Sequence, residues 1–210
     1  MPDAPISGQT ARQVGTFWAD GGISRKTPME DTFLIRQTLG GQRDAFRLLV
    51  LRHQRGVFRF LGVLGFVGQA AEDLAQEAFL RAYRHLGDFD ASRSKFSTWL
   101  FTIVRNLAAN EAERAHRRHE DRRQELESRP AVADPAPDPL RMAVANEGRR
   151  RLQQAIDGLP EVLRAALLLT RVEGLSVEEA AAVENCAVGT VKSRVFRARE
   201  LLRAALSEER

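Results

Sequence analysis

Apolar residues recur at spacings of three and four along most of this chain, and this periodicity limits the folds open to it. The pattern runs through RDAFRLLVLRHQRGVFRFLG (43–62) and QAAEDLAQEAFLRAYRHL (69–86), which contain few helix-breaking residues. Such spacing places apolar side chains on one face of an α-helix, whereas a half-buried strand needs strict alternation. No segment alternates in this way, so the sequence predicts an all-α fold.

A proline-rich break divides the helical pattern into two parts. Residues ESRPAVADPAPDP (127–139) carry four prolines and almost no large apolar side chain. Such a composition is typical of an extended linker. We therefore expect two small helical domains joined by a flexible proline-rich linker. The predicted parts are a mobile arm (1–28), a first domain (29–118), the linker (119–144) and a second domain (145–210).

Composition and termini narrow the class of protein. The amino terminus lacks the basic and apolar pattern of a signal peptide, and no apolar run is long enough to span a bilayer. Cys186 is the only cysteine, so no disulfide can form within one chain. No catalytic or metal-ligating constellation stands out. We expect a cytoplasmic protein that does not insert into membranes, is not an enzyme and needs no cofactor.

The segment SVEEAAAVENCAVGTVKSRVFRARELL (176–202) predicts a helix, a short turn and a second helix. Ser176 and Glu179 have the spacing of a capping box at the start of the first helix. Asn185 in the turn tolerates the left-handed backbone that glycine would adopt. This arrangement is typical of a helix-turn-helix, whose second helix enters the DNA major groove.

The second helix carries a basic face opposite an apolar stripe. The stripe consists of Val191, Val195, Ala198, Leu202 and Ala205. Side chains off this stripe can pair with bases or phosphates, and the helix N-terminus can hold a phosphate through its amides. The candidate DNA-binding residues are Gly189, Thr190, Lys192, Ser193, Phe196, Arg197, Arg199 and Arg203. The alternatives are a solvated basic face and, for Phe196, packing against a neighbouring helix.

Two pairs of segments resemble a known family. AEDLAQEAFLRAYRHLGDFD (71–90) and FSTWLFTIVRNLA (96–108) resemble region 2 of bacterial sigma-70 factors, and LPEVLRAALLLTRVEGLSVEEAA (159–181) and VGTVKSRVFRARELL (188–202) resemble region 4. The layout without an intervening domain is similar to the extracytoplasmic-function (ECF) group. The resemblance implies a promoter-specificity subunit that recognises −10 and −35 elements and promotes DNA melting. It also implies as partners core RNA polymerase (the β′ clamp helices and the β subunit), promoter DNA and an anti-sigma factor.

The resemblance assigns roles to two further sets of residues. The set expected to bind core polymerase shares one helix face and consists of Asp73, Gln76, Glu77, Leu80 and Arg84. The alternative there is a solvated face with a pair between Glu77 and Arg81. The set expected to bind the −10 element consists of Lys95, Phe96, Trp99, Arg105, Asn106, Asn110, Arg114 and Arg117. Aromatic rings can stack unpaired bases, but we expect at least two of Phe89, Phe96 and Trp99 to be core residues.

Two other classes of protein remain open. One is a helix-turn-helix regulator that binds operators without joining RNA polymerase, and the other is a sigma mimic that binds only an anti-sigma factor. The chain also departs from the family pattern at Glu184, Asn185 and Cys186, where apolar, glycine and small residues are more common. Cys186 is either a redox-sensitive thiol or a small packing residue.

Overall fold

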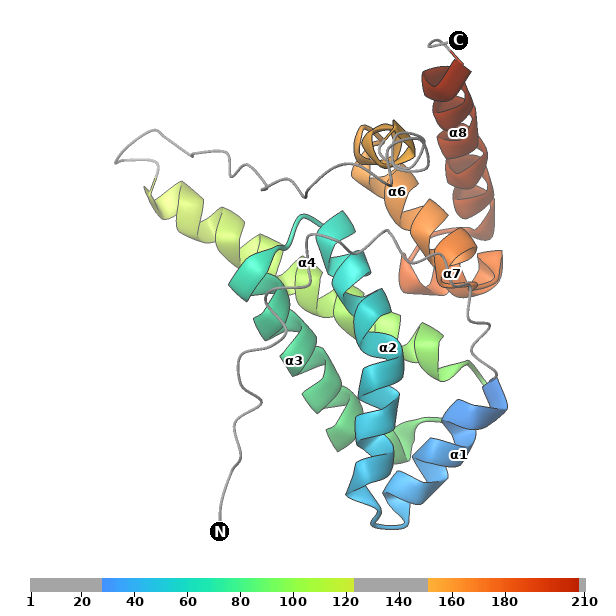
Figure 1. The fold of residues 1–210 in the computed structure, drawn as a ribbon. Helices are drawn as coiled ribbons and strands as arrows, with labels where there is room; N and C mark the ends of the chain where they lie inside the picture. Colours follow the sequence, from blue (N-terminus) through green and yellow to red (C-terminus); the bar gives the residue numbers. More distant parts are fainter. Residues whose placement is uncertain (1–27, 123–150, 208–210) are drawn as a thin grey trace, which may run out of the picture.

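The computed structural model describes residues 28–122 and 151–207, and every regular element in these ranges is helical. This confirms the all-α prediction for the described part of the chain. Most of the predicted arm and linker lies outside the described residues. Two groups of helices are visible, joined in sequence through residues 123–150 (Figure 1).

The first group, here called the N-terminal bundle, holds four helices and one short turn. Phe60 and Phe101 meet edge to face at its centre, with ring centroids 5.5 Å apart. Leu49 and Leu100 are also fully buried there. In chain order the elements are α1 (Pro28–Leu39), α2 (Arg43–Val63), α3 (Gly68–Arg84), η2 (Leu86–Asp88) and α4 (Phe96–Arg122).

A buried polar cluster fastens α1 to α2. Asp31 accepts a hydrogen bond from Arg52 at 2.6 Å, and Nε2 of His53 lies 3.0 Å from its other carboxylate oxygen. Burial opposes ionisation of Asp31, but the hydrogen bonds and charges of His53 and Arg52 outweigh it and lower the pKa of this carboxyl. His53 also packs edge to face on Phe96 at the start of α4. The cluster therefore ties α1 to the segment that leads into α4.

The second group, here called the C-terminal bundle, begins with a helical segment at residues 151–157. Pro160 stands at the N-cap position, one residue before α6. Gly174 has a left-handed backbone (φ 71°), which ends the helical run before α7. The later elements are α6 (Glu161–Leu167), the π-helical turn η3 (Leu168–Val172), α7 (Val177–Val183) and α8 (Val188–Ser207).

The helix-turn-helix prediction is confirmed in its local details. The Ser176 hydroxyl accepts a bond from the Glu179 amide at 3.1 Å, and the Glu179 carboxylate accepts one from the Ser176 amide at 2.6 Å. This reciprocal pair is the predicted capping box. Asn185 adopts the predicted left-handed conformation (φ 48°) in the turn between α7 and α8.

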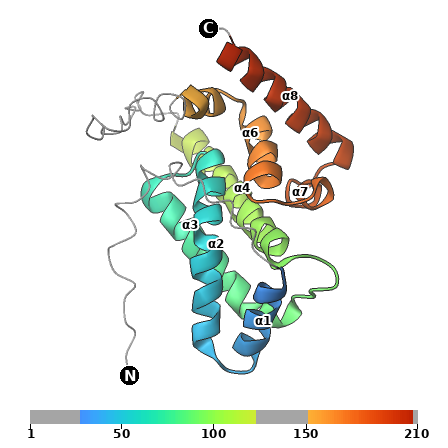
Figure 2. The same ribbon diagram turned by 45° about the vertical axis from the view of Figure 1, so that its right-hand side comes forward.

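The two bundles pack against each other, which the sequence did not predict. Helix α4 contacts α7, and α2 contacts α6. Buried residues of both bundles, such as Val104 and Leu169, belong to one contiguous apolar core. In Figures 1 and 2, α6 and α7 lie between α8 and the N-terminal bundle. One surface of α4 is therefore covered, whereas α8 lies at the outside of the molecule.

Candidate nucleic-acid interface

Helix α8 separates its apolar and polar side chains cleanly over its first turns. Val191, Val195 and Ala198 are buried against the C-terminal bundle. Phe196 is 67% exposed, which is unusual for a phenylalanine and shows that it does not pack against a neighbouring described helix. Lys192, Ser193 and Arg197 are exposed with it. The helix therefore presents cations and an aromatic ring to solvent on a face of their own.

The cations of α8 are not all equally available. Lys192 and Arg197 make no ion pair with any acid in the described ranges, whereas Arg203 pairs with Glu200 at 2.8 Å. Arg199 is exposed as well. Among the residues predicted from the sequence, Lys192 and Arg197 are the cations best placed to meet a new anionic partner.

The N-terminus of α8 has fewer free amides for a phosphate than the sequence predicted. The amide of Thr190 already donates to the carbonyl of Ala187 at 2.9 Å, so it is not free to hold a phosphate. The Thr190 carbonyl in turn accepts a bond from the Ser193 hydroxyl at 2.9 Å. Gly189 is exposed at the start of the helix. This end of the helix can approach a phosphate through the Gly189 backbone, but not through the Thr190 amide.

The loop before α4 is supported by an aromatic cluster. Phe96 is 2% exposed, and it lies 5.8 Å, measured between ring centroids, from both Phe89 and Trp99. Phe89 and Trp99 are partly buried and pack against the same core. Only Phe96 is thus a buried core residue, whereas we expected at least two of the three rings to be in the core; Phe89 and Trp99 pack against the core and stay partly exposed. Phe96 packs under the loop against Phe89 and Trp99. Its ring is therefore not accessible to an unpaired base in this conformation, which corrects its predicted contact with the −10 element.

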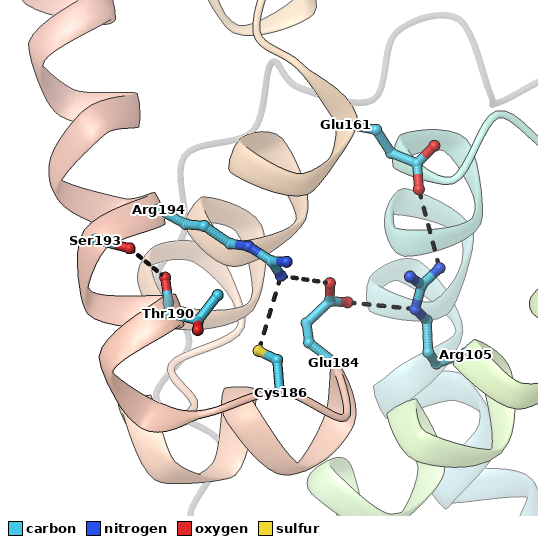
Figure 3. Close-up of polar contacts among 7 residues, drawn as sticks. All are labelled: Arg105, Glu161, Glu184, Cys186, Thr190, Ser193 and Arg194. Carbon is cyan, nitrogen blue, oxygen red and sulfur yellow. Dashed lines mark hydrogen bonds and ion pairs between the residues drawn. The ribbon is translucent and has the colours of Figure 1, made fainter.

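The other residues predicted to contact the −10 element fall on two surfaces. Asn106, Asn110, Arg114 and Arg117 are exposed along α4. Arg105 instead points at the C-terminal bundle, where its side chain lies 3.6 Å from Glu184 and 3.9 Å from Glu161, as Figure 3 shows. The structure thus separates Arg105 from the four residues with which the sequence grouped it.

Glu184 is the centre of this polar network. Its side chain is 1% exposed and lies between Arg105 of α4 and Arg194 of α8, whose nearest nitrogen is 3.5 Å away (Figure 3). Burial raises the pKa of the Glu184 carboxyl, and the charges of Arg105 and Arg194 only partly oppose this effect. Arg194 also lies 3.8 Å from the Cys186 sulfur. Cys186 is partly buried and packs against the core, as expected of a small packing residue.

The residues predicted to bind core polymerase share the exposed face of α3. Asp73 accepts a bond from Gln69 at 2.8 Å, and Glu77 pairs with Arg81 at 2.6 Å, so the alternative of a local helical pair is also present. Gln76, Leu80 and Arg84 are exposed on the same helix.

A groove runs between α3 and α4. Asp73 and Glu77 line one side, and Asn110 and Arg114 line the other. Two residues expected to bind DNA therefore lie beside two residues expected to bind polymerase. Sequence reasoning placed these residues in different interfaces, because it could not show that the start of α3 faces the second half of α4.

Three residues at the contact between the two bundles were not predicted from the sequence. Glu173 pairs with Arg59 at 2.7 Å across the two bundles, and Gly56 lies beside that pair. The sequence carried one signal for polar contacts between the bundles: Glu184 is a charged residue where the family pattern favours an apolar one. Among the described residues there is no cluster of acidic, histidine or cysteine side chains suited to a metal ion. Within the same ranges, no helix has the length and apolar character needed to cross a membrane.

Family models match both bundles. The model for Sigma-70 region 2 matches residues 49–118, and the model for Sigma-70, region 4 matches residues 149–202. RNA polymerase sigma-H factor from Pseudomonas aeruginosa is 40% identical over 186 residues, which cover 86% of this chain and 95% of that protein. ECF RNA polymerase sigma-E factor from Escherichia coli K12 is 37% identical over 180 residues, or 83% of this chain and 93% of that protein.

Two solved structures are similar over most of the chain. One is the sigma factor RpoE in complex with the anti-sigma factor NepR from Bartonella quintana, with a TM-score of 0.60 and 29% identity over 79% of this chain and 98% of that one. The other is CnrH in complex with the cytosolic domain of CnrY, with a TM-score of 0.57 and 26% identity over 86% of this chain and 99% of that one. Both similarities extend over more residues than either bundle contains.

Proposed function

Because the chain belongs to the extracytoplasmic-function (ECF) group of RNA polymerase sigma-70 factors, we propose that it directs core RNA polymerase to promoters by reading two DNA elements. In this proposal the C-terminal bundle reads the −35 element, and the N-terminal bundle holds polymerase and the melted −10 strand. The protein would act by binding polymerase and DNA without catalysing a reaction, as expected of a non-enzymatic transcription factor in the cytoplasm.

The observation that carries the proposal is the outward face of α8. Lys192 and Arg197 are exposed and form no ion pair within 4 Å in the described ranges, and they lie beside Ser193 and the exposed ring of Phe196. Lysine and arginine pair with guanine acceptors in the major groove, and an aromatic edge can contact a thymine methyl group. An α-helix with these side chains on one face fits the width of that groove. Arg199 and Arg203 flank the face and suit phosphates.

The N-terminal bundle supports the second half of the proposal. The exposed acids and amide on α3 offer a polar surface to a helical partner, for which we propose the β′ clamp helices. The loop at residues 89–95, together with the partly buried rings of Phe89 and Trp99, offers stacking surfaces for unpaired bases. Trapping such bases would favour the open duplex and so promote melting.

Run-off transcription with core RNA polymerase tests the proposal. We expect the protein to produce transcripts whose promoters share paired upstream elements. Replacing Lys192 and Arg197 with alanine is expected to reduce dependence on the upstream element, at about 1–3 kcal/mol for each lost base contact. Arg171→Ala is a matched control, because Arg171 is an exposed cation of the same bundle outside α8. If no complex with core polymerase forms, the proposal is wrong and an ordinary helix-turn-helix regulator becomes the better interpretation.

We also propose control by an anti-sigma factor, since the similar RpoE structure contains one. Such an inhibitor, added before core polymerase, is expected to suppress the same transcripts. Continued transcription at a saturating concentration of the cognate candidate would contradict this part of the proposal.

A further inference from the structure

A histidine occupies a position on α2 where helical spacing predicts an apolar residue. His53 lies between Leu49 and Val57 on the inward face of the helix, and both of these neighbours are fully buried. His53 is itself 1% exposed, and its Nε2 atom lies 3.0 Å from the carboxylate of Asp31 on α1. A buried polar side chain costs stability unless it is hydrogen-bonded. An apolar residue would fill the position without this cost, so the pair of Asp31 and His53 needs an explanation beyond packing.

The hydrogen bond to Asp31 fixes the orientation of the His53 ring. Although burial opposes ionisation, His53 and Arg52 lower the pKa of the Asp31 carboxyl. An ionised carboxylate only accepts hydrogen bonds, so Nε2 of His53 is the donor. Arg52, the more exposed of the two partners, donates to the other carboxylate oxygen at 2.6 Å. The carboxylate is thereby held in place, and it holds the imidazole ring at one angle.

The oriented ring of His53 supports Phe96, the first residue of α4. The two ring centroids are 5.2 Å apart and the ring planes meet at 62°, which is an edge-to-face contact. Phe96 in turn contacts Phe89 and Trp99, each at 5.8 Å between centroids. Aromatic pairs prefer defined distances and angles. A shift of the Phe96 ring therefore changes the packing of both Phe89 and Trp99.

Phe89 and Trp99 flank the loop at residues 89–95 and are the rings that stay partly exposed. They lie 5.4 Å apart between centroids. Helix α1 contacts both η2, which precedes the loop, and α4, which follows it (Figure 2). Asp31 thus belongs to the one helix that touches the chain on both sides of the loop.

We propose that the buried pair of Asp31 and His53 positions the −10 loop: the pair fixes Phe96, and through Phe96 it sets the two partly exposed rings at the spacing with which they stack an unpaired base. Asp31 and His53 are positioning residues, since neither lies on the exposed surface. The DNA part of this inference rests on the proposed function.

The fluorescence of Trp99 in the full-length chain tests the positioning of the rings. The chain has two tryptophans, so W18F leaves Trp99 as the only one and serves as the reference chain. D31A removes the acceptor for His53 without altering any of the rings. We expect D31A to shift the Trp99 emission to longer wavelength and to increase its quenching by acrylamide. An emission spectrum equal to that of the reference chain would overturn the inference.

Two further variants separate the hydrogen bond from the ring contact. H53F keeps an aromatic ring against Phe96 but cannot donate to Asp31, and we expect it to change the Trp99 emission as D31A does. It also carries the test if D31A does not fold. D31N keeps a carbonyl oxygen that can accept from Nε2, so its emission should stay close to that of the reference chain. If H53F matches the reference chain, packing alone positions the rings and the inference is wrong.

V57A is the matched control for a loss of stability. Val57 is fully buried one turn further along the same helix. We expect V57A to lower the free energy of unfolding without changing the Trp99 emission. Thermal unfolding followed by circular dichroism identifies a temperature at which all the variants are folded, and the spectra are recorded there. Equal changes of emission for D31A and V57A would show that the pair supports the fold only.

DNA binding by the complex with core RNA polymerase tests the role in stacking. A fluorescein-labelled single strand from the −10 region of a promoter found by run-off transcription and a labelled −35 duplex are the two probes. We expect D31A and H53F to bind the single strand roughly tenfold more weakly, within the range that one stacked base contributes. Their affinity for the −35 duplex should equal that of the wild type. Equal losses for both probes, or a loss for the single strand no greater than that of V57A, would overturn the inference.

The two proposals fail in different ways. If the Trp99 emission changes as expected but the wild type supports no promoter-dependent transcription, the proposed function is wrong and the positioned rings have another use. If transcription proceeds normally while D31A, H53F and V57A bind the single strand alike, the proposed function stands and the positioning role is wrong.

Discussion

The two surfaces proposed to contact DNA differ in what their cations do in the folded chain. On α8, Lys192 and Arg197 are exposed and form no ion pair within 4 Å in the described ranges, although the charge of Lys192 acts on Glu178. On the N-terminal bundle, Lys95 and Arg105 already face carboxylates of the C-terminal bundle. Residues of the same type and the same expected role thus differ in availability. A basic residue predicted to bind DNA has to be judged together with the acids that the fold brings to it.

Phe96 and Phe196 also differ in exposure, and this difference gives the largest effect on stability that we expect from a substitution. Phe96→Ala removes a ring that is 2% exposed, so we expect it to lower the free energy of unfolding by about 3–5 kcal/mol. Phe196→Ala removes a ring that is 67% exposed, and its effect on stability should stay within about 0.5 kcal/mol. Urea unfolding followed by circular dichroism measures both.

Binding to duplex −35 DNA should reverse the order of the two variants. Phe196→Ala is expected to weaken this binding, whereas Phe96→Ala should leave it unchanged at temperatures where the variant is folded. Equal losses of stability for the two variants would mean that Phe196 is packed in solution, which would remove the contrast between the surfaces.

The second prediction concerns the polar cluster of Asp31, Arg52 and His53, which holds α1 beside α2 and the start of α4. Asp31→Asn removes the charge that pairs with Arg52 and His53, and we expect it to lower the free energy of unfolding by roughly 1.5–3 kcal/mol at neutral pH. Because the pKa of Asp31 is lowered by folding, its stabilising contribution is present above the pKa in the unfolded chain. That contribution is lost as the pH falls through the lower pKa of the folded chain.

Urea unfolding over a pH series checks the prediction for Asp31. The difference between the wild type and D31N should shrink as the pH decreases. Asp88→Asn, which removes an exposed acid paired with His85 three residues earlier in the chain, is the control and should have little effect. A constant difference at all pH values would indicate that packing, and not charge, holds α1.

Local features of this fold could be predicted from the sequence, because they depend on residues that are close together in the chain. The capping box at Ser176 and Glu179 and the left-handed turn at Asn185 follow from such short-range chemistry. The buried stripe of α8 at Val191, Val195 and Ala198 follows from helical periodicity. These features fix which face of α8 points outward, while the role of that face in binding DNA stays a prediction.

Contacts between the bundles could not be predicted, because the chain that joins them sets no unique arrangement. The family resemblance grouped Arg105 with Asn110 and Arg114, yet Arg105 faces Glu184, which lies 79 positions further along (184 − 105). Nothing in the sequence indicates that Gly56 lies against Glu173, which belongs to the other bundle. Phe96 matched a family pattern for DNA contact, but burial decides its role.

The third prediction compares one cation from each surface. In the free chain, Arg197→Ala is expected to weaken binding of duplex −35 DNA by about 1–3 kcal/mol, because it removes a base contact. Arg105→Ala should not weaken this binding, since Arg105 faces the C-terminal bundle. Fluorescence anisotropy at one fixed salt concentration measures both, because the phosphate contacts make affinity depend on salt. Equal losses would show that Arg105 lies on the same DNA-binding surface, and the comparison between the surfaces would fail.

The smallest expected effect comes from Glu184, where the two surfaces meet. Burial, only partly opposed by Arg105 and Arg194, raises the pKa of this carboxyl. The folded chain therefore binds the proton more tightly than the unfolded chain, and the free energy of unfolding falls as the pH rises through the raised pKa. E184Q cannot ionise, so the stability of the wild type relative to E184Q should decrease over this range. Urea unfolding of both proteins between pH 4 and pH 8, on the order of one measurement per pH unit, is sufficient to detect the trend.

Glu200→Gln is the control for this experiment, because Glu200 is an exposed acid of α8 whose partner is Arg203 in the same helix. Its curve should run parallel to that of the wild type. If the E184Q curve is parallel as well, Glu184 is not buried in solution. The packing of α4 against α7 buries this carboxylate. That result would therefore also mean that the bundles are apart in the free chain. The cations of the N-terminal bundle would then be as accessible as those of α8, and the two surfaces would no longer differ.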